Sequence, residues 1–120
     1  MIANDPVSAV MVHVGDVPVA LAWYQTAFPQ ARRKTVTTSE QDFEFLDING
    51  VQLELVPADE KVRAGASGSV VYWQVTDFDL ALAHLQSVGA TLYRGSRSIE
   101  KGLRMCQVRD PWGNCIGLRG

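Results

Sequence analysis

The sequence predicts an α+β fold built from two βαβββ modules in tandem. Three observations predict it. Segments of the first half recur in the second half, apolar and polar residues alternate in the segments around two helical patterns, and an aspartate precedes each helical pattern. A repeat of about 60 residues is too long for a solenoid and indicates a duplicated half-domain.

The first repeated segment predicts a strand that leads into a capped helix. It reads HVGDVPVALAWY at 13–24 and QVTDFDLALAHL at 74–85. Asp16 and Asp77 can accept hydrogen bonds from N–H groups of the first helical turn, and Pro18 fits that turn. Gly89 is a suitable residue to end the second helix. We therefore expect strands at 7–14 and 70–75, each followed by a helix.

The second repeated segment predicts a β-hairpin in each half. DFEFLDINGVQLEL at 42–55 matches MCQVRDPWGNCIGL at 105–118, and both carry Asp-x-x-Gly at the predicted turn. Segments 33–39 and 91–101 supply one more strand to each half. The chain is then a single domain over 1–120, with module 1 at 1–58, a linker at about 59–68 and module 2 at 69–120.

Alternation with a period of two assigns the strand residues to two faces. One face is apolar, and we expect the two helices to cover it. The apolar face comprises Val10, Val12, Val14, Phe43, Phe45, Leu53, Leu55, Val71, Trp73, Val75, Cys106, Val108, Ile116 and Leu118.

The opposite face is mixed in character and supplies the candidate ligand-binding residues. A solvated sheet face could have the same composition, so alternation alone leaves both interpretations open. The candidates are Met11, His13, Asp42, Glu44, Gln52, Glu54, Tyr72, Gln74, Met105 and Gln107.

Composition and charge limit the class of partner. The net charge is −2, and no overall basic field favours nucleic acid. No apolar run is long enough to span a membrane, and two cysteines fit a reducing cytoplasm, where we expect the protein to be located. Residues 1–60 carry three basic and nine acidic side chains, whereas residues 61–120 carry eight and four. These complementary halves can attract within one chain or between two, and we expect a homodimer.

The paired modules, the VGD…ALAWY segment and the DPWGN turn together resemble the vicinal oxygen chelate superfamily. It includes glyoxalase I, extradiol dioxygenases and bleomycin-resistance proteins. The resemblance covers nearly the whole chain. It implies a curled mixed sheet around a cavity, so that the mixed face lines a concave ligand site.

The resemblance also implies where a metal would bind. Metal-dependent members carry one His, Gln or Glu ligand on each of four strands, and the matching positions here are Ala9, Glu54, Val70 and Gly117. Three of these residues have no coordinating side chain. His13 lies on the predicted face of Glu54, but two ligands fall short of the usual three or four. We therefore expect no metal and no other cofactor.

Two functions follow from these expectations. The first is a metal-free binding protein, closest in character to the bleomycin-resistance members, that sequesters a cationic, partly aromatic small molecule such as an antibiotic. Asp42, Glu44 and Glu54 would supply carboxylates for that cation. The alternative is a lyase or isomerase that acts on a small carbonyl compound, with Glu54 as the base and His13 as its partner. Without a metal, such an enzyme lacks an obvious electrophile.

The remaining notable residues have structural interpretations. Cys106 and Cys115 are predicted on opposite faces, which argues against a disulfide between them, and Cys115 faces the cavity. His84 belongs to the second helix, on the surface or half-buried. Trp112 at the turn could cover the sheet end, meet a dimer partner or border the ligand site, and these alternatives stay open.

Overall fold

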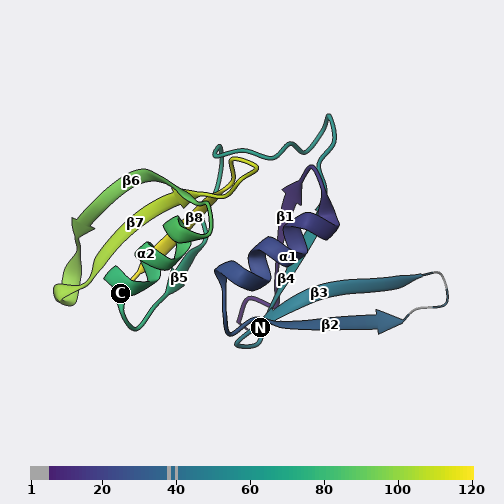
Figure 1. Ribbon diagram of the computed structural model, residues 1–120, viewed down its shortest axis with the longest axis horizontal. Coiled ribbons are helices and arrows are strands. Elements are labelled where there is room, and N and C mark those ends of the chain that lie inside the picture. Colours follow the sequence, from purple (N-terminus) through teal and green to yellow (C-terminus); the bar gives the residue numbers. More distant parts are fainter. Residues whose placement is uncertain (1–5, 38, 40) are drawn as a thin grey trace, which may run out of the picture. The chain divides into compact units, whose positions relative to one another are not determined.

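The computed structural model describes residues 6–37, 39 and 41–120. The chain divides into two compact units, unit 1 (Met1–Arg63) and unit 2 (Ala64–Gly120). The α-helix and strands of each unit follow the order βαβββ, and unit 2 has a short 3-10 helix in addition. Figure 1 shows this arrangement. The predicted α+β fold of tandem modules is thereby confirmed.

Unit 1 consists of β1 (Ala9–Val14), α1 (Val17–Ala27), β2 (Arg32–Thr37), β3 (Asp42–Ile48) and β4 (Val51–Pro57). Its sheet has the order β1-β4-β3-β2. β1 runs parallel to β4, and the other pairs are antiparallel. The antiparallel β2–β3 pair extends beyond α1 as a ribbon, and every residue of β2 is exposed (Figure 1).

Unit 2 repeats this topology. It consists of β5 (Tyr72–Gln74), α2 (Phe78–Ser87), β6 (Thr91–Ser98), the short 3-10 helix η1 (Glu100–Gly102), β7 (Arg104–Arg109) and β8 (Cys115–Arg119). The sheet order is β5-β8-β7-β6, with β5 parallel to β8. The strands of the described chain thus form two four-stranded sheets, one in each unit, rather than one continuous sheet.

The helix caps are those predicted from the sequence. The Asp16 carboxylate accepts a hydrogen bond from the Val19 N–H at 3.2 Å, and the Asp77 carboxylate accepts one from the Leu80 N–H at 3.0 Å. Gly89 follows α2 with φ of 107°, a conformation that glycine adopts without strain. Among the residues that the structure describes, no helix has the length and apolar character needed to cross a membrane.

The Asp-x-x-Gly segments form the two predicted hairpin turns. In unit 1 the Asp47 carboxylate accepts from the Gly50 N–H at 3.0 Å. In unit 2 Asp110 is only 4% exposed, and its Oδ1 accepts from the N–H groups of Trp112 at 2.9 Å and Asn114 at 2.8 Å. The Asn114 amide oxygen in turn accepts from the Gly65 N–H at 2.9 Å. The aspartate side chain therefore organises the turn of each hairpin.

Each sheet buries one apolar face beneath its own helix, as predicted. In unit 1, α1 contributes Leu21 and Tyr24 and packs on β3 and β4. In unit 2, α2 contributes Phe78 and Leu85 and packs on β8. Burial of these side chains is the main stabilising contribution to each unit. The buried strand residues of these two faces are Val14, Leu46, Ile48, Leu53, Leu55, Cys106, Val108, Ile116 and Leu118.

The predicted faces of β3 are wrong. Leu46 pairs with Leu53, and directly paired residues share a face, so Leu46 and not Phe45 points toward α1 with Leu53. The segment DFEFLDI has apolar residues in both phases, because Phe45 and Leu46 are adjacent. The phase that contains Leu46 and Ile48 prevails because it meets the apolar residues of β4. Phe43 and Phe45 consequently lie on the face of the sheet that points away from α1.

Candidate functional site

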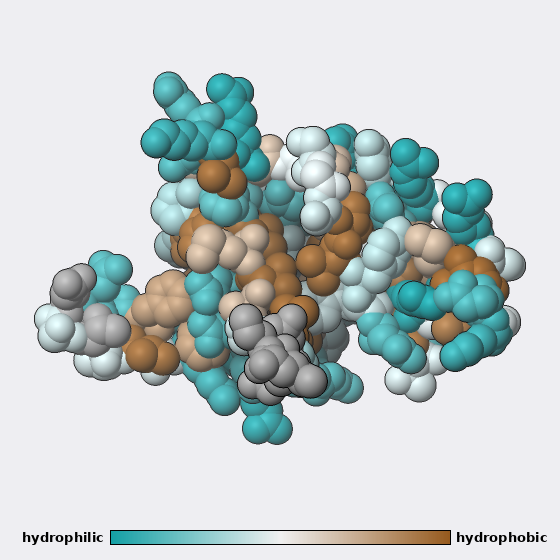
Figure 2. Space-filling view, turned by 180° about the vertical axis from the view of Figure 1, so that it is seen from behind, coloured by the Kyte–Doolittle hydropathy of each residue, from teal (hydrophilic) through white to brown (hydrophobic). Residues whose placement is uncertain are grey.

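The open face of unit 1, the side away from α1, brings four of the predicted site residues together. Pairing of β1 with β4 places Met11 directly opposite Glu54, and His13 and Gln52 share their face. The Gln52 Nε2 donates a hydrogen bond to Glu54 Oε2 at 2.7 Å. Met11 is 56% exposed. In Figure 2, which views the molecule from behind, apolar side chains lie among polar ones on this unit.

Aromatic side chains join this face as a result of the β3 register. The rings of Phe43 and Phe45 stack with their centroids 6.1 Å apart. Lys34, paired with Phe45 across the strands, forms an ion pair with Asp47 at 3.4 Å. The open face of unit 1 therefore combines aromatic and thioether groups with the Glu54 carboxylate.

The predicted cluster of three carboxylates is not formed. Asp42 and Glu44 have the same phase as Leu46 in β3, and so they lie on the opposite face from Glu54. Glu44 is bound there by Arg33, whose Nε lies 2.7 Å from its Oε2. The prediction that Asp42 and Glu44 lie on the ligand-binding face is wrong, because pairing of Leu46 with Leu53 sets the phase of β3.

The open face of unit 2 carries the other four predicted site residues. Tyr72 of β5 and Gln107 of β7 are both paired with Gly117 of β8, so the three residues share a face. The Gln107 Nε2 donates a hydrogen bond to the Tyr72 hydroxyl at 2.7 Å. Gln74 and Met105 belong to the same face through their pairing with Arg119.

The Tyr72 ring occupies the space that a side chain at position 117 would need. A β-carbon placed on Gly117 would lie 2.5, 2.7 and 2.8 Å from Cδ1, Cγ and Cε1 of Tyr72. Contacts this short do not occur between real side chains, so any larger residue would displace the ring. The aromatic ring thus lies over β8 at the point where glycine leaves room for it.

Two arginines of this face were missed in the sequence. Arg94 pairs with Gln107 and Arg97 pairs with Met105, although the arginines are three residues apart and their partners two. Register shifts lie between Leu92 and Arg94 and between Arg94 and Arg97. These β-bulges bring both arginines to one face, which strict alternation does not allow. The Arg-x-x-Arg spacing in the sequence therefore does not predict that the two arginines share a face.

Unit 2 contains a pocket of about 220 Å³ on this open face. Residues of β5, β6 and β7 form its walls. Its lining consists of Tyr72, Arg94, Gly95, Arg97, Met105, Cys106 and Gln107.

The residues present do not fit a metal ion. Of the four positions implied by the family resemblance, only Glu54 has a donor side chain, and it is engaged by Gln52. The place of a side chain at Gly117 is taken by the Tyr72 ring. Within the described ranges, no three His, Cys, Asp or Glu side chains are grouped as a metal site requires.

The two cysteines are free thiols on opposite faces of the β7–β8 pair. Burial raises the pKa of Cys106, despite the nearby Arg104. Burial also raises the pKa of Cys115, and this outweighs the opposite effect of Arg109 and Arg94. A raised pKa favours the protonated thiol at neutral pH. Neither cysteine is therefore an activated nucleophile.

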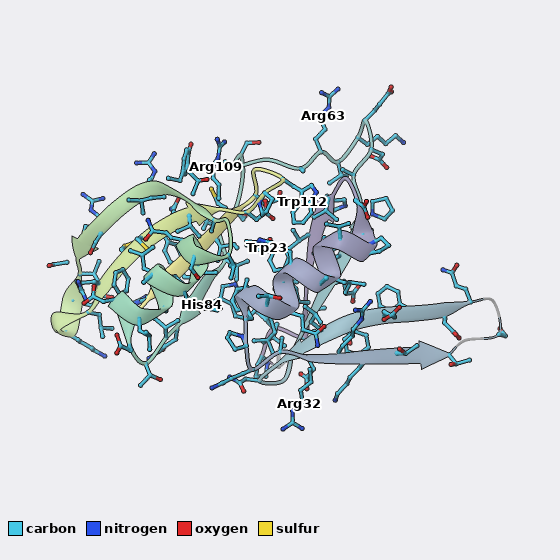
Figure 3. The ribbon with its side chains drawn as sticks, viewed as in Figure 1. Trp23, Arg32, Arg63, His84, Arg109 and Trp112 are labelled. Carbon is cyan, nitrogen blue, oxygen red and sulfur yellow. The ribbon has the colours of Figure 1, made fainter. Side chains whose placement is uncertain are left out.

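Several of the side chains labelled in Figure 3 make structural contacts. Trp23 and His84 come from the helices, α1 and α2. Trp23 packs edge-to-face on Tyr24, with ring centroids 4.9 Å apart. Trp112 is half-buried at the β7–β8 turn, where its backbone N–H is bound by Asp110. Arg109 stacks on Tyr93, with its guanidinium carbon 4.5 Å from the ring centroid.

Comparison with known proteins identifies relatives of this fold. Residues 7–118 match the family model of the Glyoxalase/Bleomycin resistance protein/Dioxygenase superfamily. No curated protein matches the chain significantly. Among solved structures, a member of that superfamily from Sphaerobacter thermophilus has a TM-score of 0.75 at 19% identity, with 97% of each chain covered.

Two further solved structures are similar over almost their whole length. TnmS3, an antibiotic binding protein from Streptomyces sp. CB03234, has a TM-score of 0.71 at 21% identity, covering 98% of this chain and 97% of TnmS3. TioX from Micromonospora sp. ML1 has a TM-score of 0.66 at 20% identity, covering 96% and 98%. At these identities the likeness shows a common fold.

Proposed function

The chain belongs to the Glyoxalase/Bleomycin resistance protein/Dioxygenase superfamily, and we propose that this member binds a flat, partly aromatic small molecule without transforming it. Sequestration of an antibiotic would be one use of such binding. One observation carries the proposal above the others. Gly117 stands at the β8 position where the family resemblance implies a metal ligand, and the Tyr72 ring occupies the space that a side chain there would need.

The composition of the open faces supports binding of such a molecule. Unit 1 presents the half-buried Phe43 and the exposed Met11 on the face of Glu54, and unit 2 presents Tyr72 and Met105 in its pocket. Aromatic rings and thioethers accept flat apolar groups, and a few polar groups fix their orientation. The antibiotic-binding neighbour TnmS3 shares the fold and so offers a precedent for this use.

The positions of the carboxylates remove the main argument for a cationic ligand. A cation was expected from the sequence because three carboxylates were placed on one face, but Asp42 and Glu44 lie on the other. Glu54 remains, and it accepts a hydrogen bond from Gln52. The proposed ligand is therefore flat and partly aromatic, and it needs no positive charge.

A thermal-shift screen of flat aromatic antibiotics tests this function. A ligand at 100 times its Kd is expected to add about 2.7 kcal/mol to the free energy of unfolding. The compound should be recovered chemically unchanged after long incubation, as mass spectrometry would show. Tyr72→Ala should reduce the thermal shift, whereas Leu80→Ala, at a position on α2 that is 67% exposed, should leave it intact. Chemical conversion of a bound compound would contradict the proposal, and so would the absence of binding by every antibiotic in the screen.

We also propose that the protein functions as a homodimer. β1 and β5 are edge strands of their sheets, paired on one side only within the described chain, and such edges are available for association. Residues 1–60 are acidic overall and residues 61–120 are basic overall, which favours head-to-tail contact. Sedimentation equilibrium should give about twice the 13.2 kDa mass of the chain. A monomer mass throughout the micromolar range would contradict the proposal.

A further inference from the structure

The pocket of unit 2 is formed around two guanidinium groups. Arg94 and Arg97 project from β6 and line the pocket with Met105 and Gln107 of β7. The register shift between Leu92 and Arg94 brings Arg94 to this face, and the shift between Arg94 and Arg97 brings Arg97 to the same face. Gly95 lies between them in the lining, and nothing lies within 4 Å of the place where its β-carbon would be. The space beside the arginines is therefore open.

The positive charge of this pocket is not neutralised from within. Among the described residues, neither Arg94 nor Arg97 forms an ion pair. Each of the four acidic residues of unit 2 has a partner elsewhere, and none lines the pocket. They are Asp77 as the cap of α2, Asp79 paired with Arg104, Glu100 paired with Arg119, and Asp110 in the β7–β8 turn.

The third polar group of the pocket is also a donor. The Tyr72 hydroxyl accepts the hydrogen bond of Gln107 Nε2 at 2.7 Å. Its own proton is consequently left for an acceptor outside that pair. Two guanidinium groups and one hydroxyl proton all favour an oxyanion, and arginine binds carboxylates with particularly good geometry. The Tyr72 ring and the Met105 thioether supply the apolar part of the wall.

We propose that this pocket binds the carboxylate of a small aromatic acid. The carboxylate oxygens are held by Arg94 and Arg97, and the ring of the acid lies against Met105 and Tyr72. This inference rests on the proposed function, since it names the ligand class of one of its open faces. The ligand inferred here is an anion, whereas the sequence predicts a cation. The difference arises because the two arginines share a face only through the shifted register of β6.

Benzoate, benzamide and benzamidine provide matched probes, because they have nearly the same shape and differ in charge. Titration of the full-length protein, followed by the amide resonances of Gly95 and Gly117, should give benzoate an affinity at least tenfold higher than that of benzamidine. Benzamide should fall between them. Arg94→Gln and Arg97→Gln should each weaken benzoate binding about tenfold, which corresponds to one charge-assisted hydrogen bond.

Lys101→Gln is the matched control for these variants. It removes the same charge from unit 2 at an exposed residue outside the pocket lining, and it should change benzoate affinity less than twofold. A dispersed amide spectrum of each variant shows that it is folded. The inference is overturned if benzamidine binds as tightly as benzoate, if the two arginine variants behave like Lys101→Gln, or if no fragment shifts these resonances. In each of these cases the antibiotic screen still decides the proposed function independently.

Discussion

Replacement of Asp110 by alanine is expected to lower the free energy of unfolding by about 2–4 kcal/mol. Asp110 is 4% exposed, and its Oδ1 accepts from the N–H groups of Trp112 and Asn114. The Asn114 Nδ2 donates to its Oδ2 at 3.2 Å. Alanine leaves all three donors without this acceptor in a partly buried turn, and a buried unsatisfied donor is costly. Urea denaturation followed by circular dichroism would measure the change.

Asn is the matched replacement at this position. Asp110→Asn keeps one carbonyl oxygen that can accept from the two backbone N–H groups, but its amide nitrogen cannot accept from Asn114. It should therefore lose less than half of the stability that alanine loses. Equal losses for the two variants would show that the charge and not the acceptor geometry stabilises the turn. A loss below about 0.5 kcal/mol for alanine would contradict the role of Asp110 in the turn.

The fold could be predicted from the sequence because its signals are local and occur twice. Asp16 and Asp77 cap the helices, and Asp47 and Asp110 organise the hairpin turns, as expected from their positions in the repeat. These interactions span only two to four residues, so they depend little on the rest of the chain. The duplicated order of elements then fixes the topology of each unit.

The candidate site was harder to predict because it depends on register. In β3 the adjacent Phe45 and Leu46 make both phases of alternation plausible, and pairing with Leu53 decides between them. That pairing is a tertiary contact. It moves Glu44 away from Glu54 and brings Phe45 to the open face, and with this change the expected cation site loses its basis.

The arginines of unit 2 were missed for a related reason. Apolar and polar residues do not alternate along TLYRGSRS, the sequence of β6, so its pattern does not show which way each side chain faces. The register of β6 with β7 also shifts twice. Arg94 and Arg97 would lie on opposite faces of a regular strand. Tyr72, Met105 and Gln107, by contrast, come from strands with regular pairing and lie on the face predicted for them.

Introduction of a side chain at Gly117 is the second large effect that we expect. Gly117→Ala should destabilise the protein by about 2–3 kcal/mol, because its β-carbon would lie within 3 Å of three ring carbons of Tyr72. The cost is steric and not conformational. Gly117 lies within β8 and its φ is not positive, so alanine can adopt the same backbone conformation. Chemical denaturation would measure the change.

Combination with Tyr72→Ala separates this steric cost from a general intolerance of β8. In the Tyr72→Ala background the ring is absent, so Gly117→Ala should cost less than 1 kcal/mol, and the two changes should be coupled by at least 1 kcal/mol. Equal costs in both backgrounds would place the conflict elsewhere in β8. Coupling would show that the Tyr72 ring and the absence of a side chain at Gly117 depend on each other. The aromatic wall of the pocket would then exist because β8 carries no side chain at the position where the family resemblance implies a metal ligand.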